Sequence, residues 1–161
     1  MIVVSNASPI INLAAVERLD LLRQLYGQVT IPQAVYDEMV VAGAGQPGAT
    51  KVATSGWIKT RQVTNETVVA ALRLELDPGE AEAIALAVEL KADSLLLDER
   101  KGREIALRLG CKTVGLLGIL VEAKHTGLVP AVKPIMDELI ERAGFWITAS
   151  LYDRVLQAVE E

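Results

Sequence analysis

Polar side chains stand directly after two of the apolar segments of this chain. Asn6 follows the run Ile2-Val3-Val4-Ser5, and Asp98 follows the run Ser94-Leu95-Leu96-Leu97. Glu80 stands at the start of the apolar helix expected before the second run. In open parallel sheets, functional sites form where loops leave the carboxyl ends of the strands. These three residues are therefore the first candidates for chemistry.

The residue types available for that chemistry are restricted. Cys111 is the only cysteine and His125 the only histidine in the chain. One cysteine excludes an internal disulfide and a cysteine-based zinc site. One histidine excludes a histidine-cluster metal site and disfavours a Ser-His catalytic triad. Any catalytic or metal-binding groups must therefore be carboxylates, hydroxyls, amides or lysines.

The elements that would position these residues alternate along the sequence. We expect short strands at residues 2–5, 29–31, 57–60, 94–97, 112–114 and 145–147. Helical spacing of apolar residues lies between them, with Ser8-Pro9 read as an N-cap followed by proline at the first helical position. The helices expected further on cover residues 32–40, 80–90, 99–109, 115–124, 133–142 and 150–161. This alternation indicates a parallel sheet with helices on both faces.

The composition fits one layered α/β domain. The 161 residues suit a single domain spanning 1–161, in which residues 145–161 form a C-terminal strand/helix extension. Hydrophobic residues make up 51% of the chain but aromatic residues only 4%, so the core must be mainly aliphatic. No apolar run approaches the ~18 residues that span a bilayer, and the start lacks the basic region of a signal peptide. We therefore expect a cytoplasmic protein.

The net charge of −5 argues against a protein that grips nucleic acid along a broad basic face. A local basic patch remains compatible with it. Five basic residues follow Asp98 within a short segment: Arg100, Lys101, Arg103, Arg108 and Lys112.

Four segments, in order, resemble the motifs of PIN domains. They are Val4-Ser5-Asn6-Ala7-Ser8-Pro9-Ile10-Ile11-Asn12-Leu13, Ile31-Pro32-Gln33-Ala34-Val35-Tyr36-Asp37-Glu38, Pro78-Gly79-Glu80-Ala81-Glu82-Ala83-Ile84-Ala85-Leu86-Ala87 and Leu95-Leu96-Leu97-Asp98-Glu99. Each segment alone is a weak signal, but four in family order are fairly specific. The chain is most similar to a largely uncharacterised PIN-like branch that has asparagine at the first acidic position and is related to VapC-type toxin ribonucleases.

The resemblance implies a three-layer α/β/α fold, a Mg²⁺ or Mn²⁺ site and cleavage of single-stranded RNA. Its catalytic and metal-binding positions correspond to Asn6, Glu38, Glu80 and Asp98. Substrate contacts would come from Ser8, Arg100, Lys101 and Arg103. The resemblance also implies a toxin role, an antitoxin partner and a homodimer. Carboxylates suit this chemistry because hard divalent cations bind oxygen ligands and can activate water.

Asn6 departs from the family pattern, in which active nucleases have aspartate. An amide oxygen can coordinate a metal but brings no charge. A unit charge ~4 Å from another is worth on the order of 4 kcal/mol at an effective dielectric of about 20. The loss of this charge motivates an alternative: a weakened or inactive PIN scaffold that binds RNA or a protein partner.

Each candidate also has an ordinary structural interpretation. Asp98 can cap the helix that follows it, and Glu80 or Glu82 can favour the dipole at a helix start. Of these two glutamates we favour Glu80 as the site residue, because Ile84 and Ala87 lie on the same helix face and that face is expected to point toward the sheet. Glu38 on an amphipathic helix, like the basic run after Asp98, can simply be solvated. A receiver-like signalling domain would also gather acids at strand ends, but it would want a lysine where Gly115 follows Val114.

Overall fold

The computed structural model describes every residue from 1 to 161 and has a five-stranded sheet at its centre. The strands lie in the order β3-β2-β1-β4-β5, and every neighbouring pair is parallel. Their bounds are β1 Val3–Ser5, β2 Val29–Pro32, β3 Ile58–Arg61, β4 Ser94–Leu96 and β5 Thr113–Val114. The parallel sheet predicted from the sequence is therefore confirmed, with the segment near Trp57 forming an edge strand.

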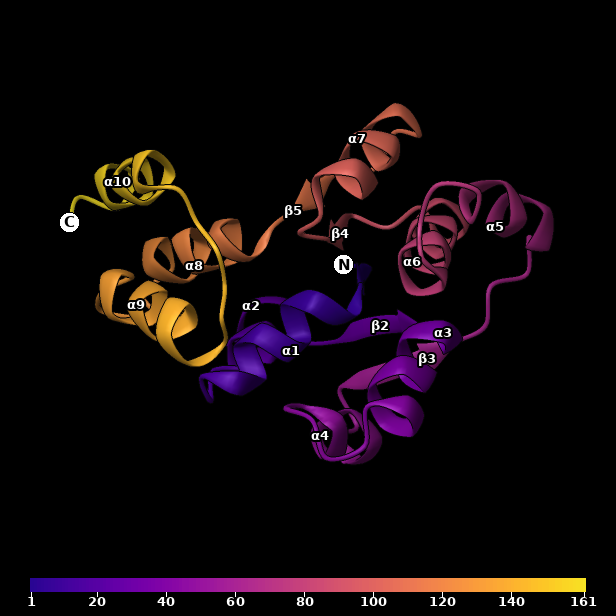
Figure 1. The fold of residues 1–161 in the computed structure, drawn as a ribbon, viewed down its shortest axis with the longest axis horizontal. Helices are drawn as coiled ribbons and strands as arrows, with labels where there is room; N and C mark the ends of the chain where they lie inside the picture. The colour runs from indigo at the N-terminus through magenta and orange to yellow at the C-terminus, as the bar shows by residue number, and fades with distance from the viewer.

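Ten α-helices and one π-helical segment connect and cover the strands (Figure 1). They are α1 Ala7–Ala15, α2 Asp20–Tyr26, α3 Gln33–Tyr36, η1 Asp37–Ala42, α4 Ala49–Thr54, α5 Glu66–Leu72, α6 Pro78–Leu90, α7 Arg100–Arg108, α8 Leu116–His125, α9 Lys133–Arg142 and α10 Ala149–Ala158. The short helices α4 and α5 had no counterpart in the sequence analysis. None of these helices has both the length and the apolar character that crossing a bilayer requires.

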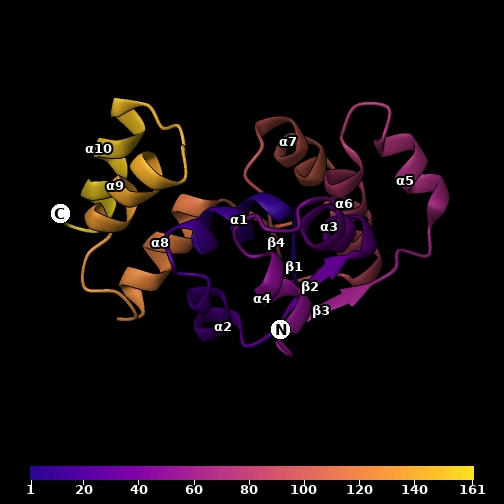
Figure 2. The same ribbon diagram turned by 60° about the horizontal axis from the view of Figure 1, so that its bottom comes forward.

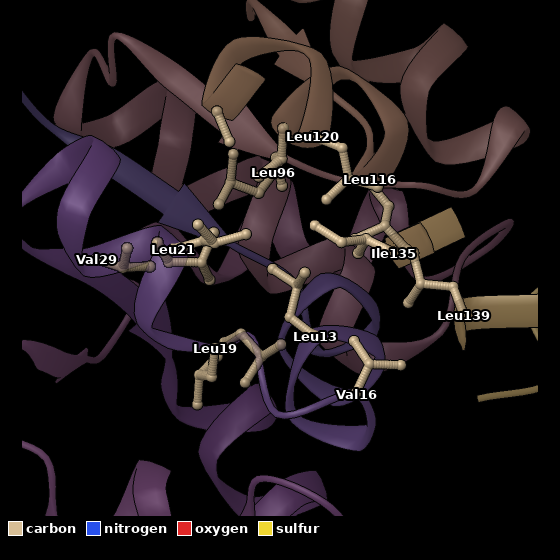
Figure 3. Packing of buried hydrophobic residues seen from close by; sticks show 14 of the residues in the cluster. Leu13, Val16, Leu19, Leu21, Val29, Leu96, Leu116, Leu120, Ile135 and Leu139 are labelled. Carbon is tan, nitrogen blue, oxygen red and sulfur yellow. The ribbon is translucent and has the colours of Figure 1, made fainter. Parts of the chain in front are cut away.

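The two faces of the sheet belong to two separate apolar clusters. Successive side chains of a strand point to opposite faces, so Val3 and Leu96 enter the larger cluster while Val4 and Leu95 enter the smaller one. The larger cluster is closed by α1, α2, α8 and α9 (Figure 3). The smaller one is closed mainly by α6, whose Ala81, Ala83, Ile84, Leu86 and Ala87 all contribute. Helices thus cover both faces, which confirms the three-layer α/β/α fold.

The strand expected at residues 145–147 does not form. This segment lies in the connection between α9 and α10, away from the two edge strands of the sheet (Figures 1 and 2). Phe145 and Ile147 pack against the larger apolar cluster, whereas Trp146 is 81% exposed. The alternation of buried and exposed side chains, which resembles a strand in the sequence, here belongs to a loop lying on helices. The final helix is present as α10.

The expected start of the first helix is also wrong. α1 begins at Ala7, with Asn6 in the N-cap position, so Ser8 and Pro9 lie inside the first turn. Proline is tolerated there because the first N–H groups of a helix have no intrahelical acceptor. Ser8 is consequently free to use its hydroxyl in tertiary contacts.

The order of the strands excludes the receiver-like alternative. A receiver sheet has the order 2-1-3-4-5, whereas here β1 lies between β2 and β4, and β3 forms an edge.

Candidate acidic site

The carboxyl ends of β1 and β4 bring Asn6 and Asp98 to the same edge of the sheet. Ser5 is paired with Leu96, and the Asn6 backbone N–H donates to the Leu96 carbonyl at 3.0 Å. A cleft of about 450 Å³ opens above these two strands. Its polar lining consists of Asn6, Ser8, Asn12, Glu38, Asp77, Asp98 and Glu99.

Glu38 reaches this cleft from η1, where the chain leaves α-helical geometry for a π-helix. Single π-helical segments are frequent at functional sites. The close approach depends on Gly79: a Cβ there would lie 2.9 Å from Glu38 Oε1 and 3.3 Å from Asn6 Oδ1. Glycine at this position therefore lets both side-chain oxygens approach the backbone at the start of α6.

Three carboxylates form the tightest group in the site. Asp77, Glu80 and Glu99 each place an oxygen within 4.8 Å of the others. Asp77 precedes α6, where its Oδ1 accepts a hydrogen bond from Glu80 N at 2.8 Å. Glu99 precedes α7, and its side chain makes no capping bond there. Glu80 is only 3% exposed, and its Oε2 is buried without a hydrogen-bond partner.

The electrostatics follow from this crowding. Burial, together with the neighbouring carboxyls of Asp77 and Glu99, raises the pKa of Glu80 to about 8. Burial and then the charge of Asp77 also raise the pKa of Glu38. Both shifts have the physical causes expected where carboxylates are desolvated and lie close to like charges. The site therefore holds negative charge at a cost that a cation would relieve.

Asp98 has a structural role as well as a place in the cleft. Its Oδ1 accepts a hydrogen bond from Leu116 N at 2.6 Å, so it caps the start of α8. It does not cap α7, the helix that follows it, because Glu99 holds that position. Its Oδ2 lies 3.5 Å from the Ser8 hydroxyl, which in turn accepts from Asn12 Nδ2.

The pKa of Asp98 is raised, because burial outweighs three favourable contacts. These are the Leu116 N–H bond, the positive charge of Arg103 and the Ser8 hydroxyl. The guanidinium of Arg103 lies beside this carboxylate: a Cβ on Gly115 would lie 3.3 Å from both Arg103 Nη1 and Asp98 Oδ1. Arg103 thus lies near Asp98, although it is not one of the residues that line the cleft.

The other two basic candidates lie further out. Arg100 pairs with Glu104 at 3.3 Å, and its side chain is 94% exposed. Lys101 Nζ lies 3.8 Å from Glu75, outside the cleft lining. Of the three basic residues singled out in the sequence, the structure brings only Arg103 to the candidate ligands.

Glu82 takes a different direction from Glu80. Its Oε1 accepts a hydrogen bond from Ala34 N at 3.1 Å, at the start of α3. Helical geometry explains the divergence, because residues two apart on a helix face different sides. Glu80 lies in the acidic site, and Glu82 ties α6 to α3.

Sequence reasoning missed Asp77 and Glu99 as site residues. Both residues stand one position before a helix and next to a recognised motif. In the sequence, Asp77 therefore looks like an ordinary loop residue and Glu99 like an ordinary neighbour of Asp98. The available signal was their spacing from Glu80 and Asp98.

The residues present fit a divalent cation with oxygen ligands. Mg²⁺ and Mn²⁺ take carboxylate and amide oxygens, and the site offers Asp77, Glu80 and Glu99 with Asn6 and Glu38 close by. The independent sign is the buried Oε2 of Glu80, an acceptor that no protein donor satisfies. Buried polar atoms without partners are rare in folded proteins and call for an explanation such as an ion.

The chain was compared with protein families and with curated proteins. The profile of a protein family described as PIN domain matches residues 2–161. No curated protein matches the chain.

Proposed function

Because the chain belongs to the PIN-domain family, we propose that it is a metal-dependent endoribonuclease that cleaves single-stranded RNA. The observation that carries this proposal is the buried, unpartnered Oε2 of Glu80 within the group that it forms with Asp77 and Glu99. Family membership supports a nuclease-type activity, and the acidic cluster supports a bound cation. The choice of single-stranded RNA as substrate is our inference from the family.

The metal ligands in this proposal are the group of three carboxylates together with the two side chains that approach Gly79. Glu80, Asp77 and Glu99 supply charge, while Asn6 and Glu38 supply further oxygens above Gly79. A Mg²⁺ or Mn²⁺ ion held by these residues would activate a water molecule and stabilise negative charge on the phosphate. Asp77 and Glu99 offset the charge that Asn6 does not bring. The pKa of Glu80, about 8 in the absence of a cation, means that this carboxyl must release its proton when the ion binds.

The remaining cleft residues position the substrate. Asp98 holds the start of α8 and orients the Ser8 hydroxyl toward the cleft. Arg103 stands where it can bind a phosphate oxygen next to the acidic group. Arg100 and Lys101, further along the same helix, would contact phosphates outside the cleft. These phosphate contacts would fix the position of the RNA strand and would not distinguish one base from another.

A biological role as the toxin of a toxin–antitoxin pair also belongs to this proposal, with an antitoxin protein as partner. A homodimer and a cytoplasmic location remain predictions of the same kind. The family supports the toxin role, the antitoxin and the dimer, whereas the cytoplasmic location is an expectation from the sequence. A mixture of the protein with its genetic neighbours, analysed by size-exclusion chromatography, tests the antitoxin partner and the dimer together.

Cleavage assays test the enzymatic proposal directly. A fluorescently labelled single-stranded RNA should be cut in the presence of Mn²⁺ or Mg²⁺ and left intact in chelator. Glu80→Gln, which removes the buried charge, should abolish cleavage. Glu141→Gln is the matched control, because Glu141 is exposed on α9 and is not among the residues that line the cleft. Cutting that persists in Glu80→Gln, or that is independent of metal, would contradict the proposal.

A second candidate function is a scaffold that binds RNA or a protein partner without cutting. Two observations favour it: Asn6 brings no charge, and Asp98 is engaged with Leu116 N. This candidate predicts no turnover by the native protein and a gain of metal affinity in Asn6→Asp. Metal-dependent turnover by the native protein excludes it.

A further inference from the structure

A second hollow opens at the same edge of the sheet, beside the acidic cleft. It has a volume of about 420 Å³ and lies among α3, α5, α6 and the end of β3. Gln33 and Gln62, which directly follow β2 and β3, are among its lining residues. The strands β3, β2 and β1 are consecutive in the sheet, so this hollow lies on the β2–β3 side of the edge that carries the acidic cleft.

Helix α6 separates the two sites and contributes to both. Glu80 belongs to the acidic group, and Glu82 lines the second hollow. Two of the lining side chains are already fixed by the fold. Glu82 accepts from Ala34 N, and Gln33 Nε2 donates to Asp37 Oδ1 at 2.9 Å. These bonds hold Glu82 and Gln33 on the side of the hollow formed by α3 and α6, next to the segment that carries Glu38.

The opposite wall presents polar groups of complementary kinds. Gln62, Glu66 and Arg73 line the hollow, and neither Glu66 nor Arg73 takes part in an ion pair. An amide, a carboxylate and a guanidinium together offer both hydrogen-bond donors and acceptors. Beside them Val63, Val69 and Ala70 provide an apolar surface.

This combination suits a nucleobase. Sequence-specific recognition of single-stranded RNA uses unstacked bases, whose faces pack on the protein while their edges are hydrogen-bonded. Ligand pockets have volumes of ~300–1,000 Å³, and an amide, an acid or an arginine can each read a base edge. We propose that this hollow binds the base of a nucleotide flanking the scissile phosphate and gives the cleavage reaction a base preference.

The proposal deepens the ribonuclease function and rests on it for the identity of the ligand. It makes α5 a specificity element, although no expectation from the sequence placed a helix there. Glu66 and Arg73 would select among the bases, and Gln62 would complete the edge contacts. The acidic cleft would act on the phosphate alone.

The test measures binding in chelator, so that no cleavage occurs. The probes are fluorescently labelled hexauridylate and hexamers in which one internal uridine is replaced by A, C or G, followed by fluorescence anisotropy at low ionic strength. The native protein should bind one hexamer ~5- to 10-fold more tightly than the others, which is the discrimination expected from one good edge contact. Arg73→Gln should reduce this ratio, whereas Arg154→Gln, at the opposite end of the molecule on α10, should preserve it (Figure 1).

A filling variant supplies a test that changes no charge. Ala70→Phe blocks the hollow, while Ala71→Phe changes a neighbouring exposed position of α5 that does not line it. Loss of base preference in the first variant and retention in the second supports the proposal. Equal binding of all four hexamers by the native protein, no binding of any, or preference that survives Ala70→Phe overturns it. Base preference without metal-dependent cleavage would reject the ribonuclease function and leave the hollow as a base-binding site. Metal-dependent cleavage without base preference would keep the ribonuclease function and reject the base-binding hollow.

Discussion

Glu80→Gln should stabilise the metal-free protein at alkaline pH while removing its ability to bind metal. The Glu80 carboxyl is 3% exposed, and its Oε2 has no partner. Burial raises its pKa from 4.5 to about 8. Since the folded state holds this proton more tightly than the unfolded chain does, the free energy of unfolding falls as pH rises from 4.5 to about 8.

The size of the effect follows from the shift. One pKa unit corresponds to about 1.36 kcal/mol. Because water reaches the exposed neighbours Asp77 and Glu99, we discount the full shift and expect on the order of 3 kcal/mol between pH 5 and pH 9. Glutamine is neutral at both pH values and nearly the same size. The variant should therefore match the native protein at pH 5 and exceed its stability at pH 9.

Urea unfolding followed by circular dichroism in chelator measures this difference. Glu141→Gln, an exposed position on α9, is the control for a general loss of negative charge. Addition of Mn²⁺ at pH 8 should raise the stability of the native protein and leave Glu80→Gln unchanged, since a ligand of the folded state stabilises it by mass action. The reasoning fails if native protein and Glu80→Gln show the same pH dependence, or if the variant is less stable at pH 9.

Three further substitutions test separate parts of the structure. Asp98→Ala removes the acceptor that caps Leu116 N and should lower stability by about 1–2 kcal/mol in thermal melts; an unchanged melting temperature would contradict the capping role. Gly79→Ala places a methyl group 2.9 Å from Glu38 Oε1 and should weaken Mn²⁺ binding several-fold, while the free energy of unfolding in chelator stays equal or rises because alanine is the better helix former. Native Mn²⁺ affinity in calorimetry would refute this. Glu161→Ala removes the carboxylate that accepts from the first backbone N–H groups of α9 and should cost about 1 kcal/mol, read from urea unfolding; no loss would remove that carboxylate as a cap.

The sequence was sufficient for the parts of the fold that local patterns encode. Short aliphatic runs such as Leu95-Leu96-Leu97 are typical of central strands of a parallel sheet, because side chains on both faces of the strand are apolar. The alternation of such runs with helical spacing then determines the layers. Phe145 to Ile147 shows the limit of this approach: the same in–out alternation serves a loop packed on helices, and only the distance from the sheet distinguishes the two.

The candidate site also has residues that local sequence patterns predict and residues that they do not. Asn6, Glu38, Glu80 and Asp98 were identified because they stand in motifs, and the structure brings them to one edge of the sheet. The partners of Glu80 could not be identified so, because their proximity depends on how α6 and α7 meet in space. The π-helical geometry of η1 has no signal in Asp37–Ala42 itself. It does have a local one in the next residue, because a Cβ on Gly43 would lie 2.6 Å from the Glu38 carbonyl oxygen.

Calorimetric titration with Mn²⁺ tests the central claim most directly, that buried and exposed carboxylates around Glu80 form a cation site. Asp77→Asn keeps the size of the side chain and an acceptor oxygen for Glu80 N but removes one charge, and Asp153→Asn on the exposed face of α10 is its control. The native protein and Asp153→Asn should bind saturably, and Asp77→Asn should bind about tenfold more weakly or worse. Absence of binding by the native protein, or equal affinity in all three proteins, would contradict the claim.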